Sequence, residues 1–466
     1  MKPNTRVKNR RDCDLRDWLE RLDTTERLTT INSGTHLKFE LAGIANRLDG
    51  TQASFFPEPD GHDIPVVSGL ISSRRWMAEA LGLEEGELVP AFQHAVANPL
   101  PSITVVTPPC QEVVHEDPDL TKLLPIPTHN EHDSGPYISA GLAITKNPRT
   151  GAQNVAIHRL QLSGPKELGA LLLPRHTLSF FETVEQEGVD LDIAIVIGTS
   201  PATLLASQAV VPIDFDELEI AGALGSAPLQ VAKCIDSDIK IPAAAEIVIE
   251  GKIAANTRAP EGPFGEFPQY YGKRSENHVI RVNKVTHRVA PIFHTIVGGG
   301  LEHLLLGAIP RETTILTTLQ RNFTCVRNVY LTMGGVCRYH LVIQVENPKP
   351  GEAKNVLMAT FGAHYDIKQA IAVDTDVDIH DPHKVEWAIA TRFQADTDLV
   401  TVHNAQGSKL DPSSRDGVSS KLGYDATIPP NAPNFKFTTI RVPGENTIDL
   451  KEKINQETSY TNMRNS

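Results

Sequence analysis

Residues 258–272 read Arg-Ala-Pro-Glu-Gly-Pro-Phe-Gly-Glu-Phe-Pro-Gln-Tyr-Tyr-Gly, so that two carboxylates, Glu261 and Glu266, flank a Gly-Pro-Phe-Gly turn. Glycine adopts backbone conformations that other residues resist, and proline stiffens a turn. Such a loop can hold two carboxylates at a fixed separation. Burial of one of them would raise its pKa, so that it carries a proton at neutral pH. The alternative is a surface loop with solvated glutamates.

Three other segments carry side chains that can bind anions or metal ions. In Asn154-Val-Ala-Ile-His-Arg159, the arginine could clamp a carboxylate or phosphate, and the asparagine could offer an oxygen to a hard cation. A strand of alternating polar residues is the alternative. His176, after Leu-Leu-Pro-Arg, is either a metal ligand or a structural histidine. Glu217, in the acidic run that begins at Asp214, could bind a hard metal or lie in an acidic loop.

Motifs of several common enzyme classes are missing. The run Asp374-Thr-Asp-Val-Asp378 begins like a calcium loop, but Ile379 and Val385 stand where that loop needs glycine and glutamate. We expect it instead to end a strand and lead into a helix. The sequence contains no GxGxxG, GxxxxGKS/T or GxSxG motif. Rossmann cofactors, nucleotide hydrolysis and serine-hydrolase chemistry therefore have no basis in the sequence.

Length and composition set the broad class. The chain has 466 residues, which at ~150 residues per domain suggests about three domains. Its formal net charge is −13, and an acidic surface repels phosphate backbones and anionic lipid, so neither nucleic acid nor a membrane is an expected partner. No apolar run reaches the ~18 residues of a membrane span. The five cysteines are scattered and form no CxxC pair, which predicts a cytoplasmic protein with reduced thiols.

Hydrophobic periodicity predicts three regions that differ in secondary structure. Leu15, Trp18, Leu19 and Leu22 share one face of a first helix. Short strand-like runs separated by Gly and Pro then indicate a sheet-rich or barrel-like middle domain. We predict these strands at 103–107, 138–145, 192–197, 229–234, 246–250 and 278–286.

Beyond residue 300, helical and strand patterns alternate as in an α/β domain. A helix is predicted over 312–320, and buried strands over 341–345 and 369–373. Asp381 is a suitable N-cap for a second helix, since Pro382 fits its first turn. The tail after about residue 430 is polar and is expected to extend over a neighbour or into solvent.

Taken together, these segments identify a protein family much more specifically than any one of them alone. They stand in this order: 124–137 (LPIPTHNEHDSGPY), 154–159, His176, 217–222, 245–251, 261–266 and 387–392 (WAIATR). The series resembles the UbiD family of reversible decarboxylases, which use prenylated FMN. The resemblance implies an α/β N-terminal domain at 1–105, a central FMN-binding split β-barrel at 106–305, and a C-terminal α/β domain at 306–466 that mediates dimers.

The resemblance also implies roles for matching residues. Asn154, His176 and Glu217 match the ligands of a divalent metal, usually manganese with potassium nearby, which bridges the flavin phosphate to the protein. The matching flavin-binding residues are Asn154, Val155, Ala156, Ile157, His158, Arg159, Arg175, His176 and Glu217. Many relatives have glycine in place of Ala156. Some use a C-terminal lysine on the phosphate, for which Lys354, Lys368 and Lys421 are candidates.

Arg159, Glu261 and Glu266 match the catalytic Arg-Glu-Glu network of the family. In that network Arg159 would orient the substrate carboxylate, Glu261 would hold Arg159, and Glu266 would donate a proton after CO₂ leaves. Phe264, Phe267 and Tyr270 are close enough in sequence to line a dry pocket. The implied partners are a flavin prenyltransferase that supplies the cofactor and a second copy of the chain.

The implied substrate is an aromatic or heteroaromatic carboxylic acid, with His294 or His303 bonding to a ring substituent or heteroatom. A core histidine beside a Gly-rich turn is the alternative for both positions. Two other functions stay open. One is a partner-dependent subunit of a carboxylase complex. The other is a flavin-free, metal-dependent hydrolase or lyase that uses Asn154, His176 and Glu217.

Overall fold

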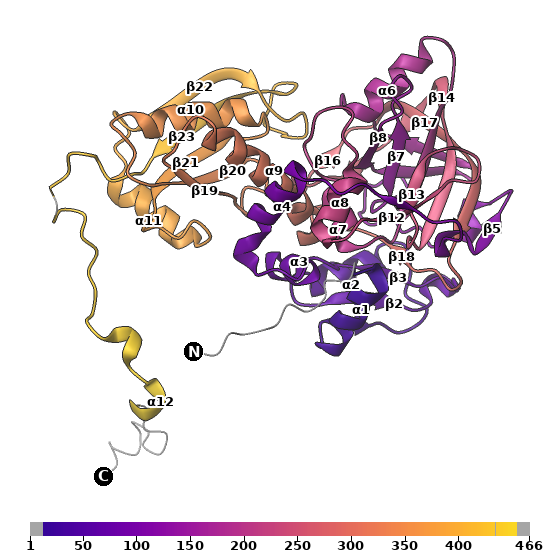
Figure 1. The fold of residues 1–466 in the computed structure, drawn as a ribbon, viewed down its shortest axis with the longest axis horizontal. Helices are drawn as coiled ribbons and strands as arrows, with labels where there is room; N and C mark the ends of the chain where they lie inside the picture. The colour runs from indigo at the N-terminus through magenta and orange to yellow at the C-terminus, as the bar shows by residue number, and fades with distance from the viewer. Residues whose placement is uncertain (1–12, 434, 454–466) are drawn as a thin grey trace. The chain divides into compact units, whose positions relative to one another are not determined.

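The computed structural model describes residues 13–433 and 435–453, which divide into two units after Thr427 (Figure 1). The second unit contains a short 3₁₀ turn, Glu445–Thr447, and helix α12 (Leu450–Lys453). Its large apolar side chains Phe435, Ile440 and Val442 are exposed. All further description concerns the first unit.

The N-terminal part of the first unit is a small sheet with helices beside it. Helix α1 (Leu15–Thr24) buries the four predicted apolar residues, and Asp14 caps it by accepting a hydrogen bond from the Asp17 backbone. The sheet has the order β1-β2-β3-β18. Its strands are β1 (Leu28–Thr30), β2 (Ala53–Phe56), β3 (Val66–Ser68) and β18 (Phe293–His294). The helices are α2 (Glu40–Leu48), α3 (Arg74–Ala80) and α4 (Leu88–Ala97).

The middle part contains a nine-stranded sheet with the order β6-β9-β10-β17-β14-β11-β7-β8, to which β5 adds by pairing with β17. Figure 1 shows this sheet as strongly curled. The predicted split barrel stays a prediction. The strands are β5 (Val113–His115), β6 (Tyr137–Ile138), β7 (Leu142–Lys146), β8 (Gln153–Ile157), β9 (Leu160–Gly164), β10 (Glu167–Ala170), β11 (Leu191–Ile197), β14 (Ile247–Glu261) and β17 (Ser275–His287).

Strand β14 is much longer than the predicted 246–250. Its first five residues are buried, whereas residues 255–260 alternate between partly buried and exposed before the fully buried Glu261. Residues 258–261 therefore end a strand and are not part of a loop. The pairing with β17 shifts register at Glu250/Gly251, where a Cβ on Gly251 would lie 2.3 Å from the Arg281 carbonyl oxygen. Glycine is needed at this close approach.

Smaller elements complete the middle part. The hairpin of β15 (Phe264–Gly265) and β16 (Tyr271–Gly272) follows β14 directly. A three-stranded sheet has the order β13-β12-β4, with β13 (Lys240–Pro242), β12 (Gln230–Lys233) and β4 (Ile103–Thr104). The helices are α5 (Leu120–Leu123), α6 (His176–Glu185), α7 (Pro201–Ala206) and α8 (Glu217–Gly225).

The C-terminal part is the predicted α/β arrangement, a five-stranded sheet of order β19-β20-β21-β23-β22. Asp381 caps α11 by accepting a hydrogen bond from the His383 backbone at 2.9 Å, as expected. The strands are β19 (Val326–Leu331), β20 (His340–Val345), β21 (Gln369–Asp374), β22 (Leu399–Gln406) and β23 (Val418–Asp425). The helices are α10 (Glu352–Ala363) and α11 (Pro382–Arg392).

Helix α9 (Leu301–Gln320) connects the middle and C-terminal parts and contacts α4 and α7 as well as β19 and α10. It begins well before the predicted residue 312 and contains Pro310, a residue that usually ends a helix. The predicted domain boundary after residue 305 thus falls inside a continuous helix. Figure 1 shows α9 between the two sheets.

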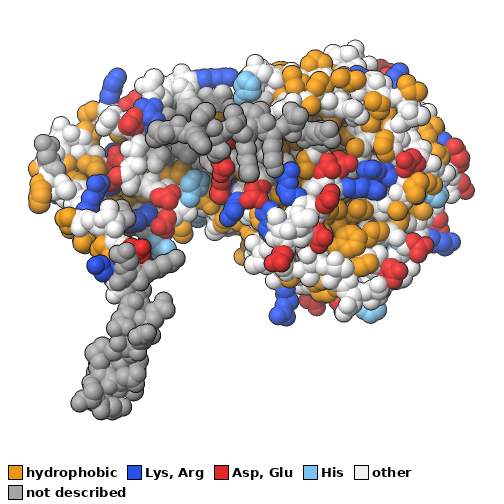
Figure 2. All heavy atoms as spheres, turned by 60° about the horizontal axis from the view of Figure 1, so that its bottom comes forward, with side chains coloured by type: hydrophobic (Ala, Val, Ile, Leu, Met, Phe, Trp, Pro, Cys, Tyr) orange, Lys and Arg blue, Asp and Glu red, His pale blue; other side chains and the backbone are white. Residues whose placement is uncertain are grey.

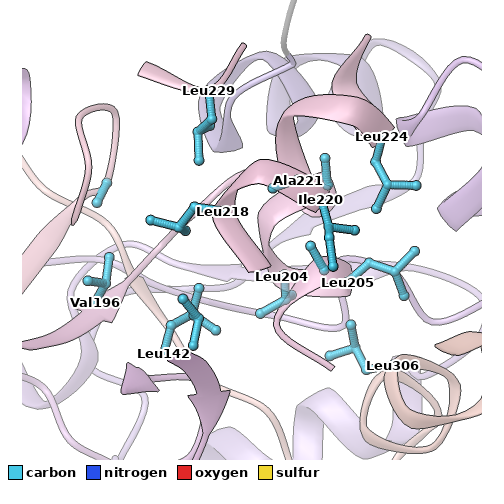
Figure 3. Packing of buried hydrophobic residues seen from close by; sticks show 14 of the residues in the cluster. Leu142, Val196, Leu204, Leu205, Leu218, Ile220, Ala221, Leu224, Leu229 and Leu306 are labelled. Atoms are coloured by element: carbon cyan, nitrogen blue, oxygen red, sulfur yellow. The ribbon is translucent and has the colours of Figure 1, made fainter. Parts of the chain in front are cut away.

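The largest apolar cluster fixes the helices that lie against the curled sheet. Figure 3 shows Leu142 and Val196 from the strands facing Leu218 and Leu204 from α8 and α7, with Leu306 of α9 nearby. All of these side chains are buried. Each contributes about 1.5–3 kcal/mol through burial, so the start of α8 at Glu217 is held in place by its own apolar face.

The surface and membrane predictions can be compared with the described residues. Over the face displayed in Figure 2, acidic and basic side chains lie interspersed, so the net charge of −13 is not gathered there. Within residues 13–433 and 435–453, no helix combines the length and apolar character of a bilayer span. Cys110, Cys234, Cys325 and Cys337 are buried thiols.

Candidate active site

Arg159 joins the two carboxylates of the Glu261–Glu266 segment. Its Nη2 donates to Oε2 of Glu261 at 2.8 Å, and its Nη1 donates to Oε1 of Glu266 at 2.5 Å. The Arg159 side chain is 7 % exposed, Glu261 is fully buried, and the Glu266 side chain is 12 % exposed. This burial excludes the alternative of a solvated surface loop. The predicted Arg-Glu-Glu residues therefore meet in space.

Three backbone features make room for the Arg159 guanidinium. Gly262 has φ +86° directly after β14, and its peptide bond to Pro263 is cis. A Cβ on Gly272, in β16, would lie 2.5 Å from Nη1 of Arg159. The ring of Phe264 lies below the guanidinium, with its centroid 5.6 Å from Cζ. The Gly-Pro-Phe-Gly turn thus wraps around a side chain that comes from the β8–β9 connection.

The two glutamates have different hydrogen-bond partners. Glu261 accepts from Arg159, from Nδ2 of Asn277 at 2.8 Å and from the Tyr137 hydroxyl at 3.0 Å. Burial, followed by the charge of Glu261, raises the pKa of Tyr137, so its hydroxyl stays protonated and donates. Glu261 is thereby held by three donors from three strands or their ends.

Glu266 lies in the β15–β16 hairpin, with its backbone N–H bonded to the Tyr270 carbonyl oxygen. Burial raises the pKa of Glu266, and the charge of Arg159 only partly opposes that shift. A carboxyl group with a raised pKa is suited to donate a proton near neutral pH. Burial also disfavours the charge of Arg159, but the two carboxylates outweigh it and raise the arginine pKa.

The apolar surroundings of Glu266 are partly as predicted. Phe264 and Phe267 are 3 % and 8 % exposed and lie on either side of Glu266 in the chain. Tyr270, which we also expected to line a dry pocket, is 61 % exposed. That expectation was wrong because Tyr270 lies at the outer turn of the hairpin, where successive side chains point to opposite faces.

The three predicted metal ligands come from β8, α6 and α8. Oδ1 of Asn154 lies 3.1 Å from Nδ1 of His176, the first residue of α6. The Asn154 amide nitrogen donates to Thr177, which directs the oxygen toward His176. Glu217, the first residue of α8, accepts from the Val155 backbone at 2.7 Å. The acidic run thus starts a helix that Asp216 caps, and it does not form a loop.

Burial disfavours the charged form of Glu217 unless a cation lies beside it. Glu217 is 3 % exposed, and burial raises its pKa to about 8. Glu217 contacts β8 at Val155, the residue after Asn154, whose oxygen lies against the His176 imidazole. A carboxylate, an amide oxygen and an imidazole are ligand types that a divalent ion accepts, and such an ion would stabilise the charged form of Glu217. Among the described residues no group of three His, Cys, Asp or Glu side chains forms a metal site, so this set depends on the amide of Asn154.

The remaining predicted flavin-binding residues border the same strand. Val155 is buried in β8, whereas Ala156, Ile157 and His158 keep partial exposure on the way to Arg159. Burial lowers the pKa of His158 to about 4, so this ring is neutral and bonds to Thr177.

The C-terminal candidates for a phosphate contact differ in placement. Arg175 is exposed and donates to the Tyr365 hydroxyl at 3.3 Å. Lys354 bonds to the Thr397 carbonyl, and Lys368 pairs with Asp411 at 2.8 Å. Lys421 is buried, with Nζ on the Ile367 carbonyl oxygen at 2.7 Å and on the carbonyl oxygen of Tyr365. Lys421 and Arg175 therefore both form hydrogen bonds with Tyr365.

The two predicted substrate histidines have different environments. His294 is 1 % exposed in β18, and its Nε2 lies 3.3 Å from Oε1 of Glu302. His303 is half-buried near the start of α9, and its ring centroid lies 6.3 Å from that of Phe267. His303 thus contacts the residue that follows Glu266, whereas His294 faces an acidic partner inside the core.

Sequence reasoning missed two residues that hold the network. Tyr137 closes the quoted 124–137 segment, but no spacing linked it to Glu261. Asn277 lies on β17, where Ser275 is the register partner of Glu261, so Asn277 is the diagonal neighbour on the same face. The register that brings it there depends on the bulges in the β14–β17 pair. The only sequence signal was an asparagine directly before the predicted strand 278–286.

Comparison with known proteins places this geometry in a family. Three models, described as the N-terminal, Rift-related and C-terminal domains of 3-octaprenyl-4-hydroxybenzoate carboxy-lyase, match residues 19–96, 103–301 and 304–426. The chain belongs to the UbiD family. It is a carboxy-lyase with the three-domain, mixed α/β UbiD-class fold, which confirms the family predicted from the sequence.

Several relatives cover nearly the whole chain. The UbiD-class enzyme HmfF from Pelotomaculum thermopropionicum, solved with FMN, is 45 % identical, with a TM-score of 0.92 over 95 % of this chain and 100 % of its own. The 3,4-dihydroxybenzoic acid decarboxylase of Enterobacter cloacae is 29 % identical, with a TM-score of 0.85 over 92 % and 98 %. An anhydromevalonate phosphate decarboxylase from Methanothermobacter thermautotrophicus is 38 % identical over 79 % of this chain and 86 % of its own.

Proposed function

We propose that this UbiD-family member is a cytoplasmic, reversible, non-oxidative decarboxylase of a small unsaturated acid, with Glu266 as the proton donor and prenylated FMN as cofactor. The observation that carries the proposal is Arg159 shared between two buried carboxylates, of which Glu266 has a raised pKa. Relatives named for a dihydroxybenzoic acid and for anhydromevalonate phosphate widen the substrate class. It covers aromatic, heteroaromatic and α,β-unsaturated acids.

The residues present fit a flavin phosphate with its metal. Asn154, His176 and Glu217 would hold Mn²⁺, with K⁺ nearby, because a buried Glu217 with a pKa of about 8 gains from a cation. Relatives have been solved with FMN and with prenylated FMN. Prenylated FMN, when bound, supplies a sink for the electron pair that remains on the substrate carbon when carbon dioxide leaves.

The side chains of this protein would bind the substrate carboxylate, donate the proton and exclude water. The buried Nε of Arg159 has no hydrogen-bond partner, so it can donate to the substrate carboxylate while both Nη atoms hold the glutamates. The carbon–carbon bond to the carboxylate breaks, and Glu266 gives its proton to the carbon that carried it. Phe264 and Phe267 keep water away during that transfer.

The proposal includes two partners. A flavin prenyltransferase would supply the cofactor, because the chemistry requires the prenylated form. A second copy of the chain would complete a homo-oligomer, as the dimeric form of the HmfF relative suggests.

The test is turnover by protein coexpressed with a flavin prenyltransferase. Purified protein is incubated in D₂O with a panel of aromatic, heteroaromatic and α,β-unsaturated acids, and carbon dioxide release and deuterium exchange are followed. We expect decarboxylation of at least one acid, with deuterium at the carbon that carried the carboxylate. Neither reaction on any acid, by protein shown by mass spectrometry to carry the cofactor, would refute the proposal.

The same preparation separates the two alternatives. A flavin-like absorption spectrum that survives dialysis excludes a flavin-free hydrolase or lyase. Turnover by a single purified protein excludes a subunit that needs other proteins. The complete Arg159, Glu261 and Glu266 set favours independent activity, because a subunit without catalysis has no need to keep an acid at a raised pKa.

A further inference from the structure

Two arginines beside the candidate active site lack the partners that other buried arginines have. Arg338 is 5 % exposed, and Arg311 is half-buried on α9. Elsewhere Arg159 pairs with Glu261 and Glu266, Arg74 with Glu312, and Arg392 with Asp374 and Asp376. Among the described residues, neither Arg311 nor Arg338 forms an ion pair. We call these two residues the arginine pair.

The arginine pair converges on one turn of α9. Nη1 of Arg311 donates to the Gly307 carbonyl oxygen at 2.8 Å, and its Nε is buried without a hydrogen-bond partner. Arg338 donates through Nη1 to the carbonyl oxygens of Leu304 and Cys337. A Cβ on Gly307 would lie 1.5 Å from Nη2 of Arg338, so any side chain at this position would displace the Arg338 guanidinium from this turn.

The electrostatic surroundings of the arginine pair are positive. Burial lowers the pKa of Arg338 to about 9, and repulsion from Arg311 adds to the shift. Burial and these two cations also lower the pKa of His364 to about 3. Asp366 is the one carboxylate whose charge opposes these shifts at both arginines. Like charges brought together inside a protein are costly unless an anion joins them.

The arginine pair lies next to the residues that would handle the substrate. Cζ of Arg338 is 5.1 Å from the ring centroid of Phe267, the residue after Glu266. His303, one α9 turn before Gly307, also contacts Phe267. Nδ1 of His303 accepts from the Gly299 backbone at 3.2 Å, which leaves the hydrogen on Nε2 free to donate.

We propose that Arg311 and Arg338, with His303, bind a second anionic group on the same small acid whose carboxylate is removed beside Glu266. The group is a carboxylate or a phosphate monoester, since a guanidinium pair binds either. The inference rests on the proposed function of that site. The substrate would lie across Phe267, with its reacting carboxylate toward Arg159 and its second anion toward the arginine pair.

The experiment measures binding to flavin-loaded protein in which Glu266→Gln prevents turnover. Titration calorimetry compares furan-2,5-dicarboxylate with 2-furoate, and anhydromevalonate phosphate with anhydromevalonate. In at least one comparison, we expect the acid with a second anionic group to bind roughly 10- to 100-fold more tightly than the acid without it, and Arg311→Met or Arg338→Met to remove that preference. A preference for furan-2,5-dicarboxylate over 2-furoate identifies a second carboxylate. A preference for anhydromevalonate phosphate over anhydromevalonate identifies a phosphate.

Arg321→Met, at an exposed position directly after α9, is the matched control and should leave the preference unchanged. Equal binding with and without the second anionic group in both comparisons, or an unchanged preference in both arginine variants, would overturn the inference. Loss of flavin absorbance from the variants would also overturn it, because the arginine pair would then hold the cofactor phosphate. Failure of the proposed function is distinct: acids with a second anionic group would bind through Arg311 and Arg338, yet the unmodified enzyme would release carbon dioxide from no acid.

Discussion

The active-site arginine and the arginine pair show how differently one residue type is used in this protein. Arg159 lies between Glu261 and Glu266, and the two carboxylates raise its pKa. Arg338 is equally buried, yet its pKa is lowered to about 9 because burial and Arg311 oppose its charge. Both arginines lie over a phenylalanine of the same hairpin region, Phe264 and Phe267.

The comparison separates a buried arginine whose charge is balanced within the protein from buried arginines that need an anion from a ligand. A buried cation with its counter-ions is compensated within the folded chain, and removing one partner leaves an uncompensated charge. A buried cation without counter-ions is costly until an anion arrives. On this basis the Arg159 network, which we propose to be catalytic, has its counter-ions within the chain, whereas the arginine pair would take its anion from a bound ligand.

The largest expected effect is at the acid of the Arg159 network. Glu266→Gln keeps the shape of the side chain but cannot donate the proton, so turnover should fall roughly 10²- to 10⁴-fold while flavin absorbance is retained. Glu276→Gln, at an exposed position on β17, is the matched control. Steady-state rates on the best acid of the panel measure both variants. A Glu266→Gln variant with wild-type rates would remove Glu266 from the mechanism.

The pH profile of the unmodified enzyme tests the same residue. The donor works in its protonated form, and burial raises the pKa of Glu266 above its usual range. Activity should therefore persist above the pH at which an exposed glutamate has ionised, and it should decline only as the pH rises through the raised pKa. Loss of activity already at the ordinary glutamate pKa would contradict the assignment.

The sequence identified the residues that meet at Arg159 better than it identified the residues that hold them in place. Glu261 and Glu266 were identified because two carboxylates around a Gly-Pro turn form a local pattern. The arginine pair was not identified, because Arg311 and Arg338 meet only where Gly307 lets a loop lie against α9. Pro310 also concealed the first half of that helix. Asn277 depended on the register of a bulged strand pair, which local spacing does not encode.

A smaller effect is expected when the Arg159 network loses its structural carboxylate. Glu261→Ala removes the charged acceptor of the Tyr137 hydroxyl and the Asn277 amide and leaves Arg159 with one carboxylate. Breaking a buried ion pair from one side lowers the free energy of unfolding by about 3–5 kcal/mol. Urea unfolding of the cofactor-free protein measures it, with Glu276→Ala as the exposed control. An unchanged unfolding midpoint would mean that the network contributes nothing to stability.

The smallest effect, and the sharpest contrast with Glu261→Ala, is expected from Arg311→Met in the same cofactor-free protein. Methionine keeps an unbranched apolar stem and removes a charge that Arg338 repels, so the free energy of unfolding should stay unchanged or rise by about 1 kcal/mol. Arg321→Met, exposed after α9, should stay within about 0.5 kcal/mol. A loss of several kcal/mol on Arg311→Met would show that the guanidinium already has its partner within the chain. The two arginine sites would then be alike, and the case for a second anion on the substrate would lose its physical basis.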